Sequence, residues 1–128
     1  MTYYINKTRE GGFEETIAQV KEALSKEGFG VLSEISINEK LKEKLGVDFR
    51  NYTILGACNP AFAFKALQEE DKIGTMLPCN VIVQQLDENN VEVAAIDPVA
   101  SMLAVENEAV AGVAIEIKAK LGRVINSL

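Results

Sequence analysis

The chain has 128 residues, of which 48% are hydrophobic and 25% are charged, a balance typical of one globular domain, here residues 1–128. Nineteen acidic against thirteen basic side chains give a net charge of −6, which repels phosphate backbones, so no nucleic-acid partner is expected. Histidine is absent and there are only two cysteines, which excludes Ser-His and Cys-His nucleophile pairs, histidine metal sites and a four-cysteine zinc site.

The hydrophobic residues are spread along the chain rather than gathered in one segment. No apolar run approaches the ~20 residues of a membrane span, and the first residues contain no long apolar region of the kind found in signal peptides. We therefore expect no membrane association and a location in the cytoplasm. Because that compartment is reducing, both cysteines should be free thiols.

The first part of the sequence predicts a strand, a helix and a second strand. Residues 2–7 include two tyrosines and an isoleucine, and predict a first strand near an edge of the sheet. Apolar residues at steps of three and four then predict a helix that ends at Gly28: Phe13, Ile17, Val20 and Leu24. Residues 30–37 predict the second strand.

A short helix is predicted after the second strand. Asn38 is expected to cap its start, Leu41 and Leu45 lie on one side of it, and Gly46 closes it. Lysines at positions 40, 42 and 44 alternate with glutamates, so we expect a solvated helix face rather than an anion site.

The third predicted strand, Tyr52–Cys58, leads directly into a helix. Asn59 is typical of a helix N-cap, and Pro60 of the first helical residue, where the missing N–H is not needed. Phe62 and Phe64 lie about 200° apart around this helix, so a single sheet cannot bury both. We expect one of them to face a pocket or another subunit.

The remaining elements are a hairpin and two helical segments. Residues 80–86 and 91–97 predict paired strands, and Asn89 and Asn90 favour the left-handed conformations of a tight turn. Asp97 is expected to cap a short helical turn that begins at Pro98. Apolar residues at steps of three and four predict a last helix from about residue 106: Val110, Val113, Ile117, Leu121, Val124 and Leu128.

The order β-α-β-(α)-β-α-β-β-α predicts an α+β domain of two layers. Its five-stranded sheet is expected to be mostly antiparallel or mixed, with the helices on one face. No linker or low-complexity segment divides the chain.

Three short motifs resemble one known family. They are Leu55–Pro60, Leu77–Val81 and Asp97–Pro98, each carrying a proline beside a cysteine, an asparagine or an aspartate. In this order they resemble the bacterial and archaeal family called "domain of unknown function 302", and the resemblance covers nearly the whole chain. It implies a compact α+β fold, a homodimer and no established reaction. It points to these residues: Cys58, Asn59, Pro60, Pro78, Cys79, Asp97 and Pro98.

Three functions fit the sequence, and an enzymatic activity stays an open question. The first is a non-enzymatic module that binds a small molecule or a partner protein, with a candidate pocket formed by the residues above together with Phe62, Phe64 and Asn80. The second is a thiol or redox activity at Cys58. The third is a soft-metal or haem-type site that uses Cys58 and Cys79. The sequence itself names no metal and no cofactor.

The role of Cys58 depends on two opposing effects. The start of the following helix lowers a thiol pKa, whereas burial at the end of a core strand raises it. A weak internal repeat aligns residues 57–60 with residues 95–98, and Ile96 then stands opposite Cys58. This repeat favours Cys58 as a small buried hydrophobic residue.

Sheet topology decides whether the two cysteines can share a site. Cys58 ends the third strand and Cys79 begins the fourth. If the two strands are antiparallel neighbours, both cysteines lie at the same end of the sheet, and we expect this arrangement because the next pair is a hairpin. We also expect a homodimer, since Phe62, Phe64 and Ile115 leave apolar surface that one domain cannot bury.

Overall fold

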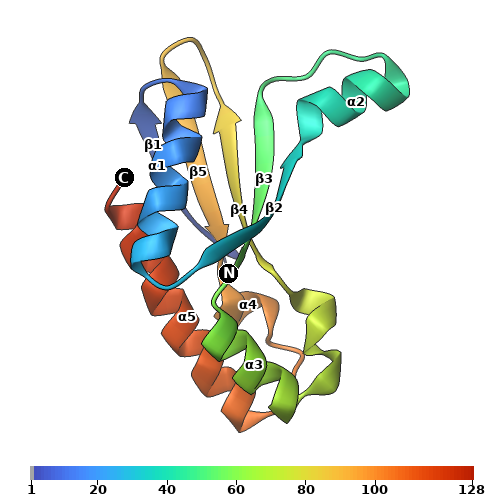
Figure 1. Ribbon diagram of the computed structural model, residues 1–128, viewed down its shortest axis with the longest axis vertical. Coiled ribbons are helices and arrows are strands. Elements are labelled where there is room, and N and C mark those ends of the chain that lie inside the picture. Colours follow the sequence, from blue (N-terminus) through green and yellow to red (C-terminus); the bar gives the residue numbers. More distant parts are fainter. Residues whose placement is uncertain (1) are drawn as a thin grey trace.

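The computed structural model describes residues 2–128, so Met1, the first residue of the predicted domain, lies outside the described part (Figure 1). Its elements follow the predicted order, with one short 3-10 helix, η1, added. In chain order they are β1 (Tyr4–Glu10), α1 (Phe13–Lys26), β2 (Gly30–Ser36), α2 (Ile37–Leu45), β3 (Tyr52–Cys58), α3 (Pro60–Glu69), η1 (Asp71–Met76), β4 (Cys79–Gln85), β5 (Asn90–Ile96), α4 (Pro98–Ser101) and α5 (Glu108–Asn126).

The five strands form one open sheet in the order β1-β5-β4-β3-β2, and every neighbouring pair is antiparallel. This arrangement confirms the predicted α+β class and the antiparallel pairing of β3 with β4. The first strand lies at one edge, as its sequence indicated. At the other edge, the register of β2 shifts between Val31 and Ser33, which leaves Leu32 as an extra residue in a bulge.

Helices α1 and α5 cover one face of the sheet, here called the inner face (Figure 1). Strand residues alternate between the two faces, and their inner-face side chains form the core with the apolar stripes of α1 and α5. The fully buried large side chains come from both layers: Leu24, Leu55, Ile73, Leu121, Ile125, Val20, Val81, Val83, Val91, Val93, Val110 and Val124. The predicted apolar positions of both helices are thus core positions.

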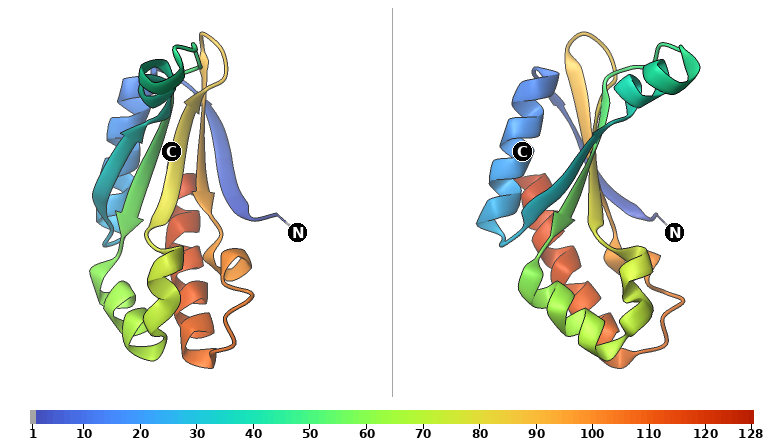
Figure 2. Two further views of the ribbon diagram at one scale, coloured as in Figure 1. Left: turned by 90° about the vertical axis from the view of Figure 1, so that its right-hand side faces the viewer. Right: turned by 45° about the vertical axis from the view of Figure 1, so that its right-hand side comes forward.

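The opposite face of the sheet, called the outer face, is bare of helices. In Figure 2 it lies open between α2 at one end and the η1 and α4 region at the other. Helix α2 projects away from both layers, and no residue of it is buried in the described part of the chain. A helix without a buried residue gains little stability from packing against the rest of its own chain.

Two predicted turn details differ from the structure. No residue among 2–128 other than glycine has a positive φ, so the left-handed conformation expected at Asn89 and Asn90 was wrong. The Asp87 carboxylate shapes the hairpin instead, since it accepts hydrogen bonds from the backbone N–H of both asparagines at 2.9 Å. The hydrogen bonds from the Asn90 side chain to both carboxylate oxygens, followed by those from the backbone, hold the pKa of Asp87 below its usual value.

The start of α2 was also predicted two residues too late. Ser36, not Asn38, occupies its N-cap position, and Asn38 lies inside the helix. The Asn38 Oδ1 accepts a hydrogen bond of 3.1 Å from the Tyr52 backbone N–H, which ties α2 to the start of β3. Gly46 closes the helix in the left-handed conformation, as predicted.

Within residues 2–128, no helix combines the length and the apolar character that crossing a membrane requires.

Candidate functional site

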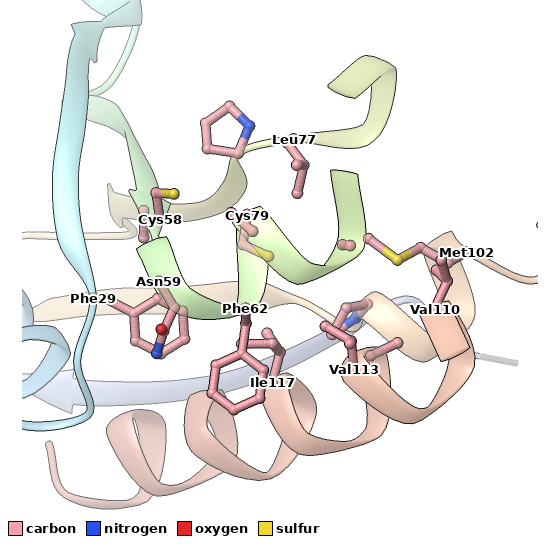
Figure 3. A pocket seen from close by; sticks show the side chains of 16 residues that line it. Phe29, Cys58, Asn59, Phe62, Leu77, Cys79, Met102, Val110, Val113 and Ile117 are labelled. Carbon is pink, nitrogen blue, oxygen red and sulfur yellow. The ribbon is translucent and has the colours of Figure 1, made fainter. Parts of the chain in front are cut away.

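The predicted site residues gather where β3 ends and β4 begins. Helices α3, α4 and α5 close over this end of the sheet and leave a cavity of about 40 Å³. Figure 3 shows its lining side chains, among them Val110, Val113 and Ile117 of α5. The full lining is Phe29, Ala57, Cys58, Asn59, Phe62, Ala63, Ala66, Leu77, Pro78, Cys79, Pro98, Met102, Val110, Val113, Ala114 and Ile117.

The structure brings together six of the ten predicted site residues. Those that line the cavity are Cys58, Asn59, Phe62, Pro78, Cys79 and Pro98. The other four do not: Pro60 and Phe64 are exposed, Asn80 is exposed and lines a shallow hollow of the outer face, and Asp97 is buried beside α5. These four residues therefore do not line this cavity.

The two phenylalanines of α3 separate as helix geometry indicated. Phe62 packs against the core and lines the cavity, and Lys120 Nζ lies 5.7 Å from the centre of its ring. Phe64 is 65% exposed. Phe62 therefore faces the pocket, and Phe64 is exposed on the surface of the chain.

The two cysteines lie at the same end of the sheet but point to different faces. Ala57 pairs with Cys79, so Cys58 is one residue out of step with it. Because successive strand residues point to opposite faces, Ala57 and Cys79 face the core while half-buried Cys58 is directed outward. The two cysteines are neighbours along the strand ends, but their side chains point to opposite faces of the sheet rather than toward a shared ligand.

The chemistry of Cys79 is that of a core residue. Burial and, to a smaller extent, the charge of a nearby Cys58 thiolate raise the pKa of the Cys79 thiol to about 11. Both cysteines are free. Because the thiolate is the nucleophile, Cys79 is inert near neutral pH.

We expect iodoacetamide to label Cys79 at least ~100-fold more slowly in the native protein than in the unfolded chain at pH 7. A pKa two units above the ordinary value of 9.0 lowers the thiolate fraction by that factor, and burial slows the reaction further. Mass spectrometry of each cysteine measures both rates, and half-buried Cys58 is the internal control. Equal labelling of native and unfolded Cys79 would contradict its placement. Rapid labelling of native Cys58 would favour the thiol hypothesis at that residue.

Asn59 does not cap α3 as predicted. It stands at the N-cap position, but its side chain accepts no hydrogen bond from the helix. Instead, its Nδ2 donates to the backbone oxygen of Glu27, at the end of α1, over 3.2 Å. The amide thus satisfies a free carbonyl of another helix and joins the cavity to the entry of β2.

Asp97 caps α4 as predicted, and it also forms an ion pair that the sequence did not reveal. Its Oδ1 accepts from the backbone N–H of Val99 at 2.9 Å, and its Oδ2 lies 2.9 Å from Lys118 Nζ. Burial alone raises the pKa of Asp97, but the hydrogen bonds from Lys118, Ala100 and Val99 and the lysine's charge outweigh it, so the pKa falls below its usual value. This carboxylate stabilises the fold above its ordinary pKa and ceases to do so as the pH falls through the lowered one.

Gly56 and Pro78 belong to two different motifs and meet across β3 and β4. A Cβ added to Gly56 would lie 2.9 Å from Pro78 Cγ and in contact with Ser33 Oγ. The Leu77–Pro78 peptide bond is cis. Glycine is therefore required at position 56 so that β3 can approach the Pro78 ring closely. The first two motifs thus contain residues that hold the two strands together beside the cavity.

The remaining lining residues come from positions that the sequence analysis assigned only to the core or not at all. The stripe of α5 supplies Val110, Val113 and Ile117, while Phe29 and Met102 lie in short connecting segments. Periodicity identified the stripe but not the cavity it faces. No group of three or more Cys, Asp or Glu placed to hold a metal ion occurs within residues 2–128.

Comparison with known proteins gives the family but no reaction. No curated protein matches the chain. The crystal structure of an uncharacterized conserved protein DUF302 from Bacillus stearothermophilus is similar, with 31% sequence identity, a TM-score of 0.90 and 98% of each chain covered. The profile of the family "Domain of unknown function DUF302" matches residues 5–128. The chain therefore belongs to the family of the domain of unknown function DUF302.

Proposed function

We propose that the chain is a non-enzymatic module that binds a small apolar molecule in the cavity between the sheet end, α3 and α5. The observation that supports this function is the lining itself, which is almost wholly apolar. The Asn59 side chain is its only amide, and that amide already donates to Glu27. Apolar lining favours binding through burial of ligand surface rather than through reaction.

The size of the cavity limits the ligand. Its volume of about 40 Å³ is well below the ~150 Å³ of an apolar cavity that admits benzene. A ligand of that size requires the helix above the cavity to move outward. The ligand class is therefore small and apolar, and binding is coupled to a displacement of α3.

Helix α3 and η1 are suited to such a displacement. Within α3 only Ala66 is buried, and within η1 only Ile73 is. The start of α3 also lacks a side-chain cap. Segments with few buried side chains open at lower free-energy cost than the core strands do.

Titration with benzene, followed by amide chemical shifts, tests this function. We expect saturable shifts at Val113 and Ile117, and Ala66→Val should weaken binding at least ~10-fold because the added carbons occupy the cavity. The matched control is Ala61→Val, the same change at an exposed position of α3. Both variants carry the same helix-propensity cost.

Two outcomes would contradict the proposal. The first is the absence of saturable shifts in the wild-type protein at the solubility limit of benzene. The second is equal weakening by the two variants, because that result would trace the effect to helix stability rather than to the cavity.

We also propose that the module is a cytoplasmic homodimer. The free state of both cysteines is compatible with a reducing compartment. Exposed apolar side chains outside the cavity support self-association, among them Leu45 and Ile35, which are 69% and 41% exposed. A soft-metal site and a thiol reaction at Cys58 stay hypotheses.

A further inference from the structure

Residues 37–51, which comprise α2 and the segment that follows it, form an arm that extends beyond the sheet (Figure 1). Its apolar side chains are only partly covered within the described chain, where the centre of the Phe49 ring lies 6.1 Å from that of Tyr52. Leu45 is 69% exposed, and Val47 and Phe49 are also exposed. A helix that buries none of its residues is marginally stable alone, so this arm requires an external surface to pack against.

The outer face of the sheet is the second uncovered surface of the same chain. Six of its side chains are apolar and at least partly exposed. In order from β2 to β5 they are Ile35, Tyr52, Ile54, Ile82, Ala94 and Ile96. The carboxylate of Glu92 lies among them but already accepts hydrogen bonds from Asn6 at 2.8 Å and Gln84 at 2.7 Å. The Glu92 carboxylate thus keeps two hydrogen bonds when this face is covered, which lowers the cost of burying it.

Charge separates the arm from the rest of the chain. The arm carries four basic and three acidic side chains, whereas the other residues carry nine basic and sixteen acidic ones. The arm is thus slightly positive and the remainder strongly negative. On the outer face itself the charged strand residues are the acidic Glu10 and Glu92, so a second copy of this chain offers a surface of complementary charge to the arm.

The flat area of the outer face alone falls short of a stable interface, and the arm reduces that shortfall. Five strands of seven residues present a flat area of roughly 450 Å². A stable interface buries about 800 Å² per partner. The α2 helix, nine residues and so about 14 Å long, adds roughly 140 Å² to that area before side-chain relief is counted.

We propose that two copies of the chain pack outer face to outer face, with the arm of each lying on the sheet of the other. The inference rests on the proposed homodimer and names its surface. A twofold axis makes the contact reciprocal, since the same arm and face occur on both copies. The exposed Phe64 and Ile115 then lie outside the interface.

Sedimentation velocity of the full chain with paired variants tests this arrangement. Leu45→Asp in the arm and Ile35→Asp on the outer face should each weaken dimerisation at least ~100-fold, because each buries an unpaired charge in the interface. The controls Phe64→Asp and Ile115→Asp place the same charge on other exposed apolar positions and should leave the dimer unchanged. Thermal unfolding checks that all four variants remain folded.

Mixing the two interface variants tests reciprocity. In the mixed dimer, the intact arm of the Ile35→Asp chain meets the intact sheet of the Leu45→Asp chain, so one contact of the two is restored. We expect a dimer in the mixture that neither variant forms alone. If the mixture stays monomeric, the arm and the outer face do not contact each other and the inference is overturned.

The remaining outcomes separate the inference from the homodimer itself. If Leu45→Asp and Ile35→Asp dimerise as tightly as the wild type, the surface is wrong while the homodimer stands. If the wild-type chain is a monomer throughout the micromolar range, both are wrong.

Discussion

Replacing Leu121 by alanine is expected to lower the free energy of unfolding by about 2–5 kcal/mol. Leu121 is fully buried in the C-terminal half of α5, where its side chain belongs to the core between that helix and the sheet. Truncation removes buried apolar surface and leaves a cavity that the close-packed surroundings fill only in part. Urea unfolding followed by circular dichroism measures the change from the shift of the midpoint.

The matched control for this substitution is Ile115→Ala on the same helix. Ile115 is 60% exposed, so its truncation should change the free energy of unfolding by no more than ~0.5 kcal/mol. A loss at Ile115 as large as that at Leu121 would mean that the two faces of α5 are assigned the wrong way round.

Gly56→Ala is expected to destabilise the fold by about 1–3 kcal/mol, although it adds only one methyl group. The new Cβ would lie 2.9 Å from Pro78 Cγ and would also meet the Ser33 hydroxyl. Ser33 can rotate away, but the proline ring beside it is rigid. Thermal and urea unfolding of the variant measure the loss.

The double variant Gly56→Ala/Ser33→Ala separates the loss of stability caused by the Ser33 contact from that caused by the Pro78 contact. Ser33→Ala removes the hydroxyl and leaves the Pro78 contact, so it should restore part of the stability lost in Gly56→Ala. Gly112→Ala is the control, since a Cβ at that position of α5 meets nothing within 4 Å. Gly112→Ala should be neutral or stabilising, because alanine is the better helix former. Equal destabilisation by the two glycine substitutions would refute the close approach at Gly56.

The fold followed from local patterns, whereas the site followed from them only in part. The apolar stripes of α1 and α5 identify core positions because helix periodicity is a local property. Asn59 and Asp97 have the same sequence context, an acceptor side chain before a proline, yet only Asp97 caps its helix. The difference arises because the end of α1 brings the Glu27 carbonyl to Asn59, a contact between residues far apart in the chain.

The relation between the two cysteines shows the same limit. Antiparallel pairing of β3 and β4 was predictable from the hairpin that follows. Their register was not, because a shift of one residue moves every side chain of a strand to the other face. That single step separates Cys79 in the core from Cys58, and no local pattern encodes it.

The two edge strands of the sheet, β1 and β2, affect how the chain behaves at high concentration. Unpaired backbone groups along a sheet margin invite further strands and, through them, fibrils. On β1, Lys7 and Arg9 point inward, where Lys7 Nζ donates to the Asn126 carbonyl over 3.2 Å and Arg9 donates to Gln19. On β2, the extra residue Leu32 interrupts the regular ladder. An incoming strand would have to displace charged side chains at one margin and match an irregular backbone at the other, so growth of the sheet into a polymer is disfavoured.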